Sequence, residues 1–194
     1  MTKEIEFYYD FISPYSFIAY KRIIEIEKKS EIKFIFKPIL LGGLHNLAKI
    51  TAPGLIQSKK NYLIRDCEIV SKKYKIDFKF NEKFPINTLN LMRGNLIVPK
   101  DKFKIYVLKC FEAYWLKNVD ILKDENIRKI LQDCEIDVDS FFLNIKKNEI
   151  KEKLKKLTQE AFESKIFGAP TFVVNNKIFW GQDRLDYALD EVKL

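Results

Sequence analysis

The sequence predicts an α/β fold in which a small four-stranded domain is interrupted by a long helical insertion. Three observations support this prediction. The chain opens with a strand–helix–strand pattern over residues 4–37, shows mostly helical patterns over 57–165, and returns to two short strands and a helix over 171–192. With 194 residues, of which 47% are hydrophobic, the chain is long enough for one domain with a large insertion and a substantial core.

The opening unit is the clearest part of the pattern. Residues 4–9, EIEFYY, and 32–37, IKFIFK, have the alternation of strands. Between them, residues 14–29 place apolar side chains three to four positions apart, as on one face of a helix. Such a crossover joins parallel strands, so we expect these two strands to pair in parallel. Ser13 is a good N-cap for the helix, and Pro14 suits its first turn.

The middle of the chain reads as a series of helices. The stretches 40–43 and 84–88 are predicted to be loop-to-helix junctions. The predicted helices span residues 57–75, 88–97, 101–116, 124–133, 138–147 and 149–165.

The end of the chain is strand-like again. Two short runs around Asn175-Asn176 predict a tight hairpin turn, and RLDYALDEV predicts a final helix with Asp183 as its N-cap. We therefore assign residues 1–56 and 166–194 to the sheet domain and 57–165 to the helical insertion domain.

Composition limits the class of partner. The net charge is +8, but Lys and Arg are interleaved with Glu and Asp, as on solvated helix faces, so no nucleic-acid partner is expected. No apolar run is long enough to span a membrane. The N-terminus lacks the zones of a secretory signal, so we expect a cytoplasmic protein without a membrane partner.

Cysteine and histidine offer little chemistry of their own. The three cysteines are far apart and form no CxxC pair, which disfavours a disulfide framework or a zinc site. Cys67 and Cys110 are interpreted as small core residues. One histidine cannot build a multi-histidine metal centre, so no metal is expected. His45, which follows Gly42-Gly43, is interpreted as a loop residue rather than a catalyst.

The stretch Ser13-Pro14-Tyr15-Ser16 has the spacing of a Cys-x-x-Cys redox site with serine in place of both cysteines. Dithiol chemistry is excluded because no cysteine occupies position 13 or 16. Two interpretations remain open. Ser13 is an ordinary helix cap, or it donates its hydroxyl to an anion at the helix N-terminus, such as a thiolate supplied by another molecule.

Two later stretches also have alternative interpretations. Gly168-Ala169-Pro170-Thr171 is a turn that opens a strand; if Pro170 is cis, it instead places a backbone edge beside Ser13 for a peptide-like ligand. Trp180-Gly181-Gln182-Asp183-Arg184 is a capped helix start, or a site that receives a carboxylate through backbone N–H groups and Gln182.

Five stretches in order, DFISPYSFIAY, FKPILLGGL, FPINTLNLMR, GAPTFVV and FWGQDRLDYALDEV, resemble the 2-hydroxychromene-2-carboxylate isomerases. These enzymes are grouped with the kappa-class glutathione transferases in the DsbA-like branch of the thioredoxin superfamily. The resemblance spans essentially the whole chain. It implies a thioredoxin-like fold, a cis-proline at Pro170, and a homodimer that binds glutathione.

The resemblance also implies roles for individual residues. Ser13 would hold the glutathione thiolate, and the Ala169 backbone beside Pro170 would pair with the cysteinyl part. Gln182 and Asp183 would meet the γ-glutamyl end. Lys59 would favour the glycyl carboxylate. Relatives carry an asparagine in the loop before the second helix; here Lys49-Ile50 lies nearest that place.

The implied second substrate is a small hydrophobic or aromatic electrophile. Its pocket would be lined by the helical insertion, where Tyr62, Phe84, Met92 and Trp115 could take part or could equally belong to the core. Three functions follow as hypotheses. The first is a glutathione-dependent isomerase of the 2-hydroxychromene-2-carboxylate type, the second a kappa-class glutathione transferase or peroxidase, and the third a redox-inactive thioredoxin-like binding module.

Overall fold

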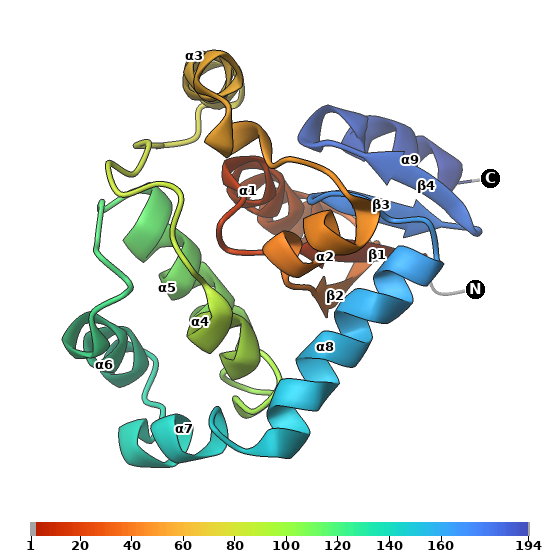
Figure 1. The fold of residues 1–194 in the computed structure, drawn as a ribbon. Helices are drawn as coiled ribbons and strands as arrows, with labels where there is room; N and C mark the ends of the chain where they lie inside the picture. Colours follow the sequence, from red (N-terminus) through yellow and green to blue (C-terminus); the bar gives the residue numbers. More distant parts are fainter. Residues whose placement is uncertain (1–2, 194) are drawn as a thin grey trace.

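The computed structural model describes residues 3–193, which build one mixed sheet with helices around it (Figure 1). The strand order is β2-β1-β3-β4. Strands β1 and β2 pair in parallel, as predicted, and β3 is antiparallel to both β1 and β4. The strands are β1 Glu4–Tyr9, β2 Lys33–Pro38, β3 Thr171–Val174 and β4 Lys177–Trp180.

The helical segments agree with the predicted order and differ by a few residues at their ends. Helices α3 to α8 lie between β2 and β3 in the chain, and α8 returns to pack against β2 and α2 (Figure 1). The segments are α1 Pro14–Lys29, α2 Leu41–Ala48, η1 Pro53–Leu55, α3 Gln57–Tyr74, α4 Leu89–Gly94, α5 Phe103–Trp115, α6 Asp124–Asp133, α7 Val138–Asn144, α8 Asn148–Glu163, η2 Gln182–Arg184 and α9 Leu185–Glu191.

Local chemistry explains the clearest boundaries. Ser13 caps α1, because its Oγ accepts the backbone N–H of Ser16 at 3.1 Å and Pro14 begins the first turn. Asn175 and Asn176 both have positive φ, which is the backbone that a tight two-residue hairpin turn requires. The predicted turn between β3 and β4 is therefore confirmed.

Two predictions about this architecture are wrong. His45 is not in a loop: it lies in α2, a short helix whose glycine-containing first turn hides the helical pattern. Asp183 does not cap the last helix. It lies within η2, and α9 begins at Leu185 with Arg184 in the N-cap position and no side-chain cap. A short 3₁₀ turn precedes α9, and the helix therefore starts one residue later than predicted.

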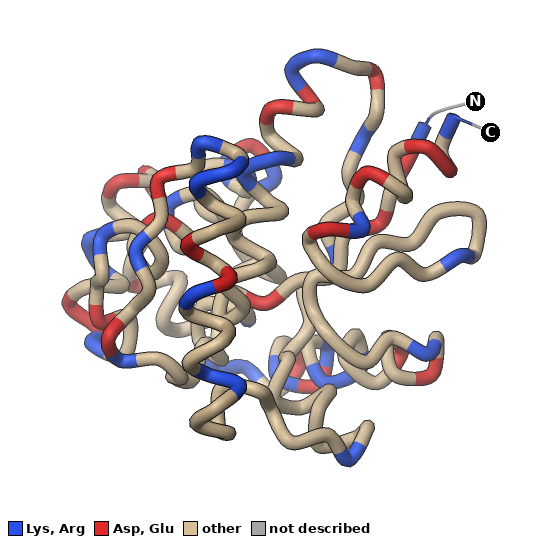
Figure 2. Tube along the Cα trace, turned by 90° about the horizontal axis from the view of Figure 1, so that it is seen from above, with Lys and Arg blue, Asp and Glu red and all other residues tan. Residues whose placement is uncertain are grey.

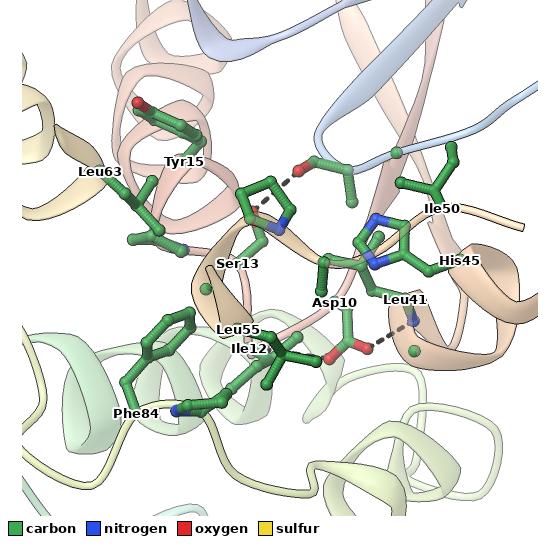
Figure 3. Close-up of a pocket in the computed structure, with 18 of the residues that line it drawn as sticks. Asp10, Ile12, Ser13, Tyr15, Leu41, His45, Ile50, Leu55, Leu63 and Phe84 are labelled. Atoms are coloured by element: carbon green, nitrogen blue, oxygen red, sulfur yellow. Dashed lines mark hydrogen bonds between the residues drawn. The ribbon is translucent and has the colours of Figure 1, made fainter. Parts of the chain in front are cut away.

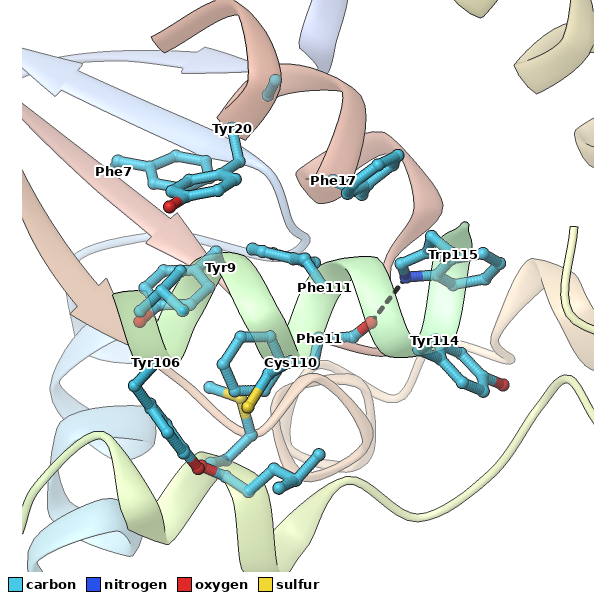
Figure 4. Packing of buried hydrophobic residues seen from close by; sticks show 14 of the residues in the cluster. Phe7, Tyr9, Phe11, Phe17, Tyr20, Tyr106, Cys110, Phe111, Tyr114 and Trp115 are labelled. Atoms are coloured by element: carbon cyan, nitrogen blue, oxygen red, sulfur yellow. Dashed lines mark hydrogen bonds between the residues drawn. The ribbon is translucent and has the colours of Figure 1, made fainter. Parts of the chain in front are cut away.

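Aromatic side chains form the core between the sheet and the helical segment, residues 57–165 (Figure 4). Phe7 of β1 stacks on Tyr9 and on Phe172 of β3, with ring centroids 5.1 and 5.5 Å apart. Trp115 at the end of α5 is fully buried, and its Nε1 donates a hydrogen bond to the Phe11 carbonyl at 2.7 Å. This bond ties α5 to the loop that leads into α1.

Core burial decides several predicted roles. Met92 and Trp115 are fully buried core residues outside the pocket lining, so the core interpretation holds for both. Cys67 and Cys110 are buried and unpaired, as predicted, and so is Cys134. Burial raises the pKa of all three thiols, that of Cys134 to about 11, so none is a ready nucleophile.

The surface carries its charge in mixed form. Figure 2 shows basic and acidic residues intermingled along the chain rather than gathered by sign. Ion pairs such as Lys28–Glu25 on α1 and Lys156–Glu160 on α8 are exposed and join neighbours on the same helix. Within residues 3–193, none of the helices combines the length and the apolar character needed to cross a bilayer.

The close approach of α4 to α5 and α7 yields a first prediction. A Cβ added at Gly94 would lie 2.1 Å from the Tyr106 Oη and 2.7 Å from Phe141 Cε2, both in the core. Gly94→Ala should therefore lower the free energy of unfolding by about 1–3 kcal/mol, measured by urea denaturation. Gly42→Ala is the control, since nothing lies within 4 Å of its added Cβ. An equal loss in both variants would contradict the steric argument.

Candidate functional site

A pocket of about 1100 Å³ opens where α1 begins (Figure 3). Its walls come from the β1–α1 loop, α2, the segment 50–55, α3, the segment 84–88 and residues 167–169. Most of its lining side chains are apolar, among them Ile12, Leu55 and Phe84. The pocket therefore lies between the sheet and the helical segment, and both contribute to it.

Ser13 lies in the wall of this pocket and is almost fully buried. Its Oγ accepts the Ser16 N–H, and its hydroxyl donates to the Ala169 carbonyl at 2.9 Å (Figure 3). The peptide bond between Ala169 and Pro170 is cis, and the Pro170 carbonyl accepts the Gly181 N–H at 2.9 Å. Ser13 thus joins the start of α1 to the segment that precedes β3.

Ser16 occupies the position of the second cysteine in a Cys-x-x-Cys site, three residues after Ser13. Its side chain is fully buried, and its Oγ has no hydrogen-bond partner in the described part of the chain. Neither position holds sulfur, so any thiol reacting at the start of α1 has to come from a ligand. The helix N-terminus still offers backbone N–H groups and a partial positive charge, which favour an anion.

Asp10 holds three parts of the pocket wall together. Its carboxylate accepts hydrogen bonds from the Leu41 N–H at 2.8 Å, the Ile12 N–H at 3.1 Å and the Thr88 hydroxyl at 2.6 Å. Burial raises the pKa of this carboxyl group, and the three hydrogen bonds oppose that rise. We infer that Asp10 positions the loop before α1, the start of α2 and the segment before α4.

Sequence reasoning did not single out Asp10. The available signal was a carboxylate inside the apolar run YYDFI. A charged group in such a run is rarely buried unless hydrogen-bond partners surround it, so its presence indicates that partners exist. What the sequence could not show is the identity of those partners, because Leu41 and Thr88 lie 31 and 78 positions away.

A second carboxylate joins α1 to α3 beside the pocket. Tyr15, which lines the pocket, donates its hydroxyl to Asp66 at 2.6 Å, and Tyr62 donates to the same carboxylate at 3.4 Å. Burial raises the pKa of the Tyr15 phenol above its usual range, so this group stays neutral. Tyr62 and Phe84, both predicted as pocket residues, do line the pocket.

The predicted glutathione contacts fall into two groups. Ser13, Lys59 and Ala169 line the pocket, and so does Ile50, which stands near the place of the family asparagine. The structure places the remaining three outside the pocket lining: Pro170, Gln182 and Asp183.

The residues at the end of β4 are held by other contacts. Gln182 is buried, its carbonyl accepts from Arg22 at 2.9 Å, and its Oε1 has no partner among residues 3–193. Asp183 lies 3.5 Å from the guanidinium of Arg184. Gln182 therefore presents an unsatisfied acceptor near the edge of the sheet, while Asp183 is a surface carboxylate.

An aromatic pair stands at the edge of the pocket. Phe167 and Trp180 are both partly exposed, with ring centroids 4.9 Å apart. A Cβ at Gly168 would come within 2.5 Å of the Trp180 Nε1, so only glycine lets the indole lie against this backbone. Sequence reasoning missed Phe167 as a pocket residue; its position just before Gly168-Ala169-Pro170 was the available signal.

His45 is the residue whose surroundings differ most from expectation. It lies on α2, and its imidazole forms part of the pocket wall (Figure 3). Burial lowers the pKa of the imidazole, so the ring is neutral near pH 7. The site thus combines an anion-stabilising helix start, a hydroxyl donor and a neutral imidazole with largely apolar walls.

Comparison with known proteins places the chain in a family. A 2-hydroxychromene-2-carboxylate isomerase from Sphingobium xenophagum is 26% identical over 193 residues, covering 96% of each chain. Glutathione S-transferase kappa 1 from Rattus norvegicus is 24% identical over 198 residues, covering 94% of this chain and 87% of that protein.

The fold agrees with these relatives. A solved 2-hydroxychromene-2-carboxylate isomerase superposes with a TM-score of 0.88 at 22% identity, covering 96% of this chain and 93% of the other. The order of elements is therefore that of a thioredoxin-like domain with a helical insertion, as predicted. Residues 4–193 match the DSBA-like thioredoxin domain, so this protein belongs to that family.

Proposed function

We propose that this protein is a glutathione-dependent isomerase of the 2-hydroxychromene-2-carboxylate type. One observation carries the proposal: the Ser13 hydroxyl lies at the N-terminus of α1, in the wall of a large apolar pocket, and neither position 13 nor position 16 is a cysteine. A site that stabilises an anion and lacks its own thiol suits a thiol supplied by the ligand. The similarity to an isomerase of this type supports the proposal.

In this proposal each predicted residue meets a different part of the tripeptide. Ser13 holds the sulfur, and the Ala169 backbone pairs with the cysteinyl part beside Pro170. Lys59 in α3 attracts the glycyl carboxylate. Gln182 and Asp183, which lie outside the pocket lining, meet the γ-glutamyl end.

The proposed reaction uses the thiolate as a reversible nucleophile. The sulfur forms a bond to an electron-poor carbon of an unsaturated aromatic pyruvate-type substrate, and the electron pair of the double bond moves to the substrate carbonyl as an enolate. Rotation about the new single bond follows. The enolate then re-forms the double bond and expels the thiolate, which leaves the isomer. Hydrogen-bond donors at the start of α1 supply the charge stabilisation.

The size of the pocket supports a second small molecule beside glutathione. Its volume of about 1100 Å³ reaches the upper end of the range of about 300–1,000 Å³ that usually serves one drug-sized ligand. Tyr62 and Phe84 from the helical segment give it aromatic walls. These features fit a small hydrophobic or aromatic electrophile.

A kappa-class transferase or peroxidase is the second candidate, because the kappa relative is almost as similar to this chain as the isomerase. The same thiolate would serve both, but in conjugation it stays bonded to the product. Assays of chromene-carboxylate isomerisation and chlorodinitrobenzene conjugation on one preparation separate them. Activity in the second assay alone would replace the isomerase by the transferase.

Ligand binding itself gives a prediction for the purified protein. Reduced glutathione at millimolar concentration should raise the melting temperature, and S-methylglutathione should raise it less because it cannot form a thiolate. No shift with either ligand would favour a redox-inactive binding module and contradict both enzymes. Equal shifts would contradict anion stabilisation at Ser13.

The homodimer is also part of the proposal and rests on the resemblance. Sedimentation equilibrium of the purified protein should give a mass of twice 23.1 kDa. A mass of one chain would contradict the dimer.

A further inference from the structure

The thiol that binds at Ser13 must lose a proton, and the pocket contains a side chain suited to accept it. His45 is the single histidine of the chain, and it lines the same pocket as Ser13. Figure 3 shows its imidazole projecting from α2 among the labelled residues of the pocket wall, which include Ser13 and Asp10. Burial lowers the pKa of its imidazole, so the ring is mainly neutral when no ligand is bound. A neutral imidazole has one nitrogen with a free lone pair.

The other titratable groups in the lining are less suited to this task. The Asp10 carboxylate from the β1–α1 loop already accepts three hydrogen bonds. Tyr15 of α1 and Tyr62 of α3 both donate to a carboxylate of α3. The ammonium of Lys59, also on α3, offers donors and no lone pair. Among the lining groups of these elements, His45 alone combines a free acceptor nitrogen with a place in the pocket.

We propose that His45 accepts the proton of the ligand thiol as glutathione binds; this inference rests on the proposed function. The S–H bond breaks, its electron pair stays on sulfur, and the proton forms the second N–H of an imidazolium. The Ser13 hydroxyl and the N–H groups of α1 then hold the thiolate. In the isomerisation the proton stays on the ring, because the thiolate is regenerated unprotonated; in a conjugation it leaves with each turnover.

Attraction between the two new charges offsets the cost that burial places on each of them. Burial disfavours the imidazolium and the thiolate separately, but the two charges attract each other more strongly in an apolar pocket than in water. A lone thiolate there would depend on the helix start and the hydroxyl alone. The proton transfer leaves the net charge of the complex unchanged, and no proton is released to solvent.

The test measures protons and thiolate together on the full chain with reduced glutathione. Thiolate is followed by its ultraviolet absorbance and released protons by an indicator in weak buffer. At pH 7 the wild type should form thiolate with little proton release. His45→Gln, which keeps a polar side chain of similar length, should release the proton to solvent and hold about tenfold less thiolate, a shift of one pKa unit. His45→Phe is the second variant, and Leu47→Gln, exposed on the same helix and outside the lining, is the control.

The outcomes separate the two proposals. Equal thiolate titrations and equal proton release in wild type, His45→Gln and His45→Phe would overturn the role of His45 and leave the glutathione site standing. If the wild type forms no thiolate with glutathione, the proposed function fails and this inference fails with it. A pH profile of turnover that shifts in His45→Gln but not in Leu47→Gln would support the proton transfer.

Discussion

Replacing Ser13 by alanine is expected to reduce isomerase turnover by about 10²–10³-fold at saturating glutathione, the usual cost of one lost donor to a developing anion. The substitution removes the hydroxyl that lies in the pocket wall and, by the proposal, contacts the thiolate. It also removes the cap of α1, which costs about 0.5–2 kcal/mol of stability. Turnover and the free energy of unfolding should therefore be measured on the same preparations.

Ser16→Ala is the matched control for this experiment. It removes a hydroxyl three residues further on, but that Oγ has no hydrogen-bond partner among residues 3–193, and Ser16 does not line the pocket. We expect turnover close to that of the wild type and unchanged or slightly higher stability. If Ser13→Ala and Ser16→Ala retain equal turnover, the start of α1 does not hold the reacting sulfur.

The second large effect is expected at Asp10. Asp10→Asn keeps the shape of the side chain but has one acceptor oxygen instead of two. Its amide NH₂ group would therefore face a donor. In one orientation that donor is the Leu41 N–H, and in the other it is the pair formed by the Ile12 N–H and the Thr88 hydroxyl. A buried donor left without a partner costs about 1–3 kcal/mol, and loss of charge weakens the hydrogen bonds that remain. We expect a loss of about 2–4 kcal/mol in the free energy of unfolding.

Thr88→Val separates the carboxylate from one of its partners. This variant removes only the Thr88 hydroxyl and leaves the two backbone donors on Asp10. The expected loss is about 1–2 kcal/mol, smaller than that of Asp10→Asn. Urea denaturation of both variants checks the order. If Asp10→Asn is as stable as the wild type, the carboxylate does not organise the pocket wall.

Local patterns were sufficient to predict most of the fold. The start of α1 is encoded by Ser13-Pro14, and the β3–β4 turn by Asn175-Asn176, because these residues prefer the required backbone without outside help. Parallel pairing of β1 and β2 followed from a general rule on crossovers. A loop-to-helix junction was predicted at 40–43, where α2 begins, but His45 was not placed in the helix because glycines in its first turn weaken the local signal.

The candidate site was harder to predict because long-range contacts decide it. Trp115 and Phe84 look alike in sequence, each an aromatic residue in the helical segment. Trp115 donates a hydrogen bond to the Phe11 carbonyl and is buried in the core, while Phe84 lines the pocket. The importance of Asp10 and the exposure of His45 to the pocket depend in the same way on elements that are distant in the chain.

The bond between Ser13 and Ala169 has a consequence for which thiols bind well. A hydroxyl has one proton, and here it is already engaged with the Ala169 oxygen. If an incoming sulfur anion accepts the Ser13 hydrogen bond, the Ala169 carbonyl loses its donor. A buried carbonyl without a hydrogen-bond donor costs free energy. A simple alkyl thiol offers no replacement, whereas a peptide thiol brings an amide hydrogen beside its sulfur. The site is thus biased toward molecules that supply a hydrogen-bond acceptor to Ser13 and a donor to the Ala169 carbonyl together.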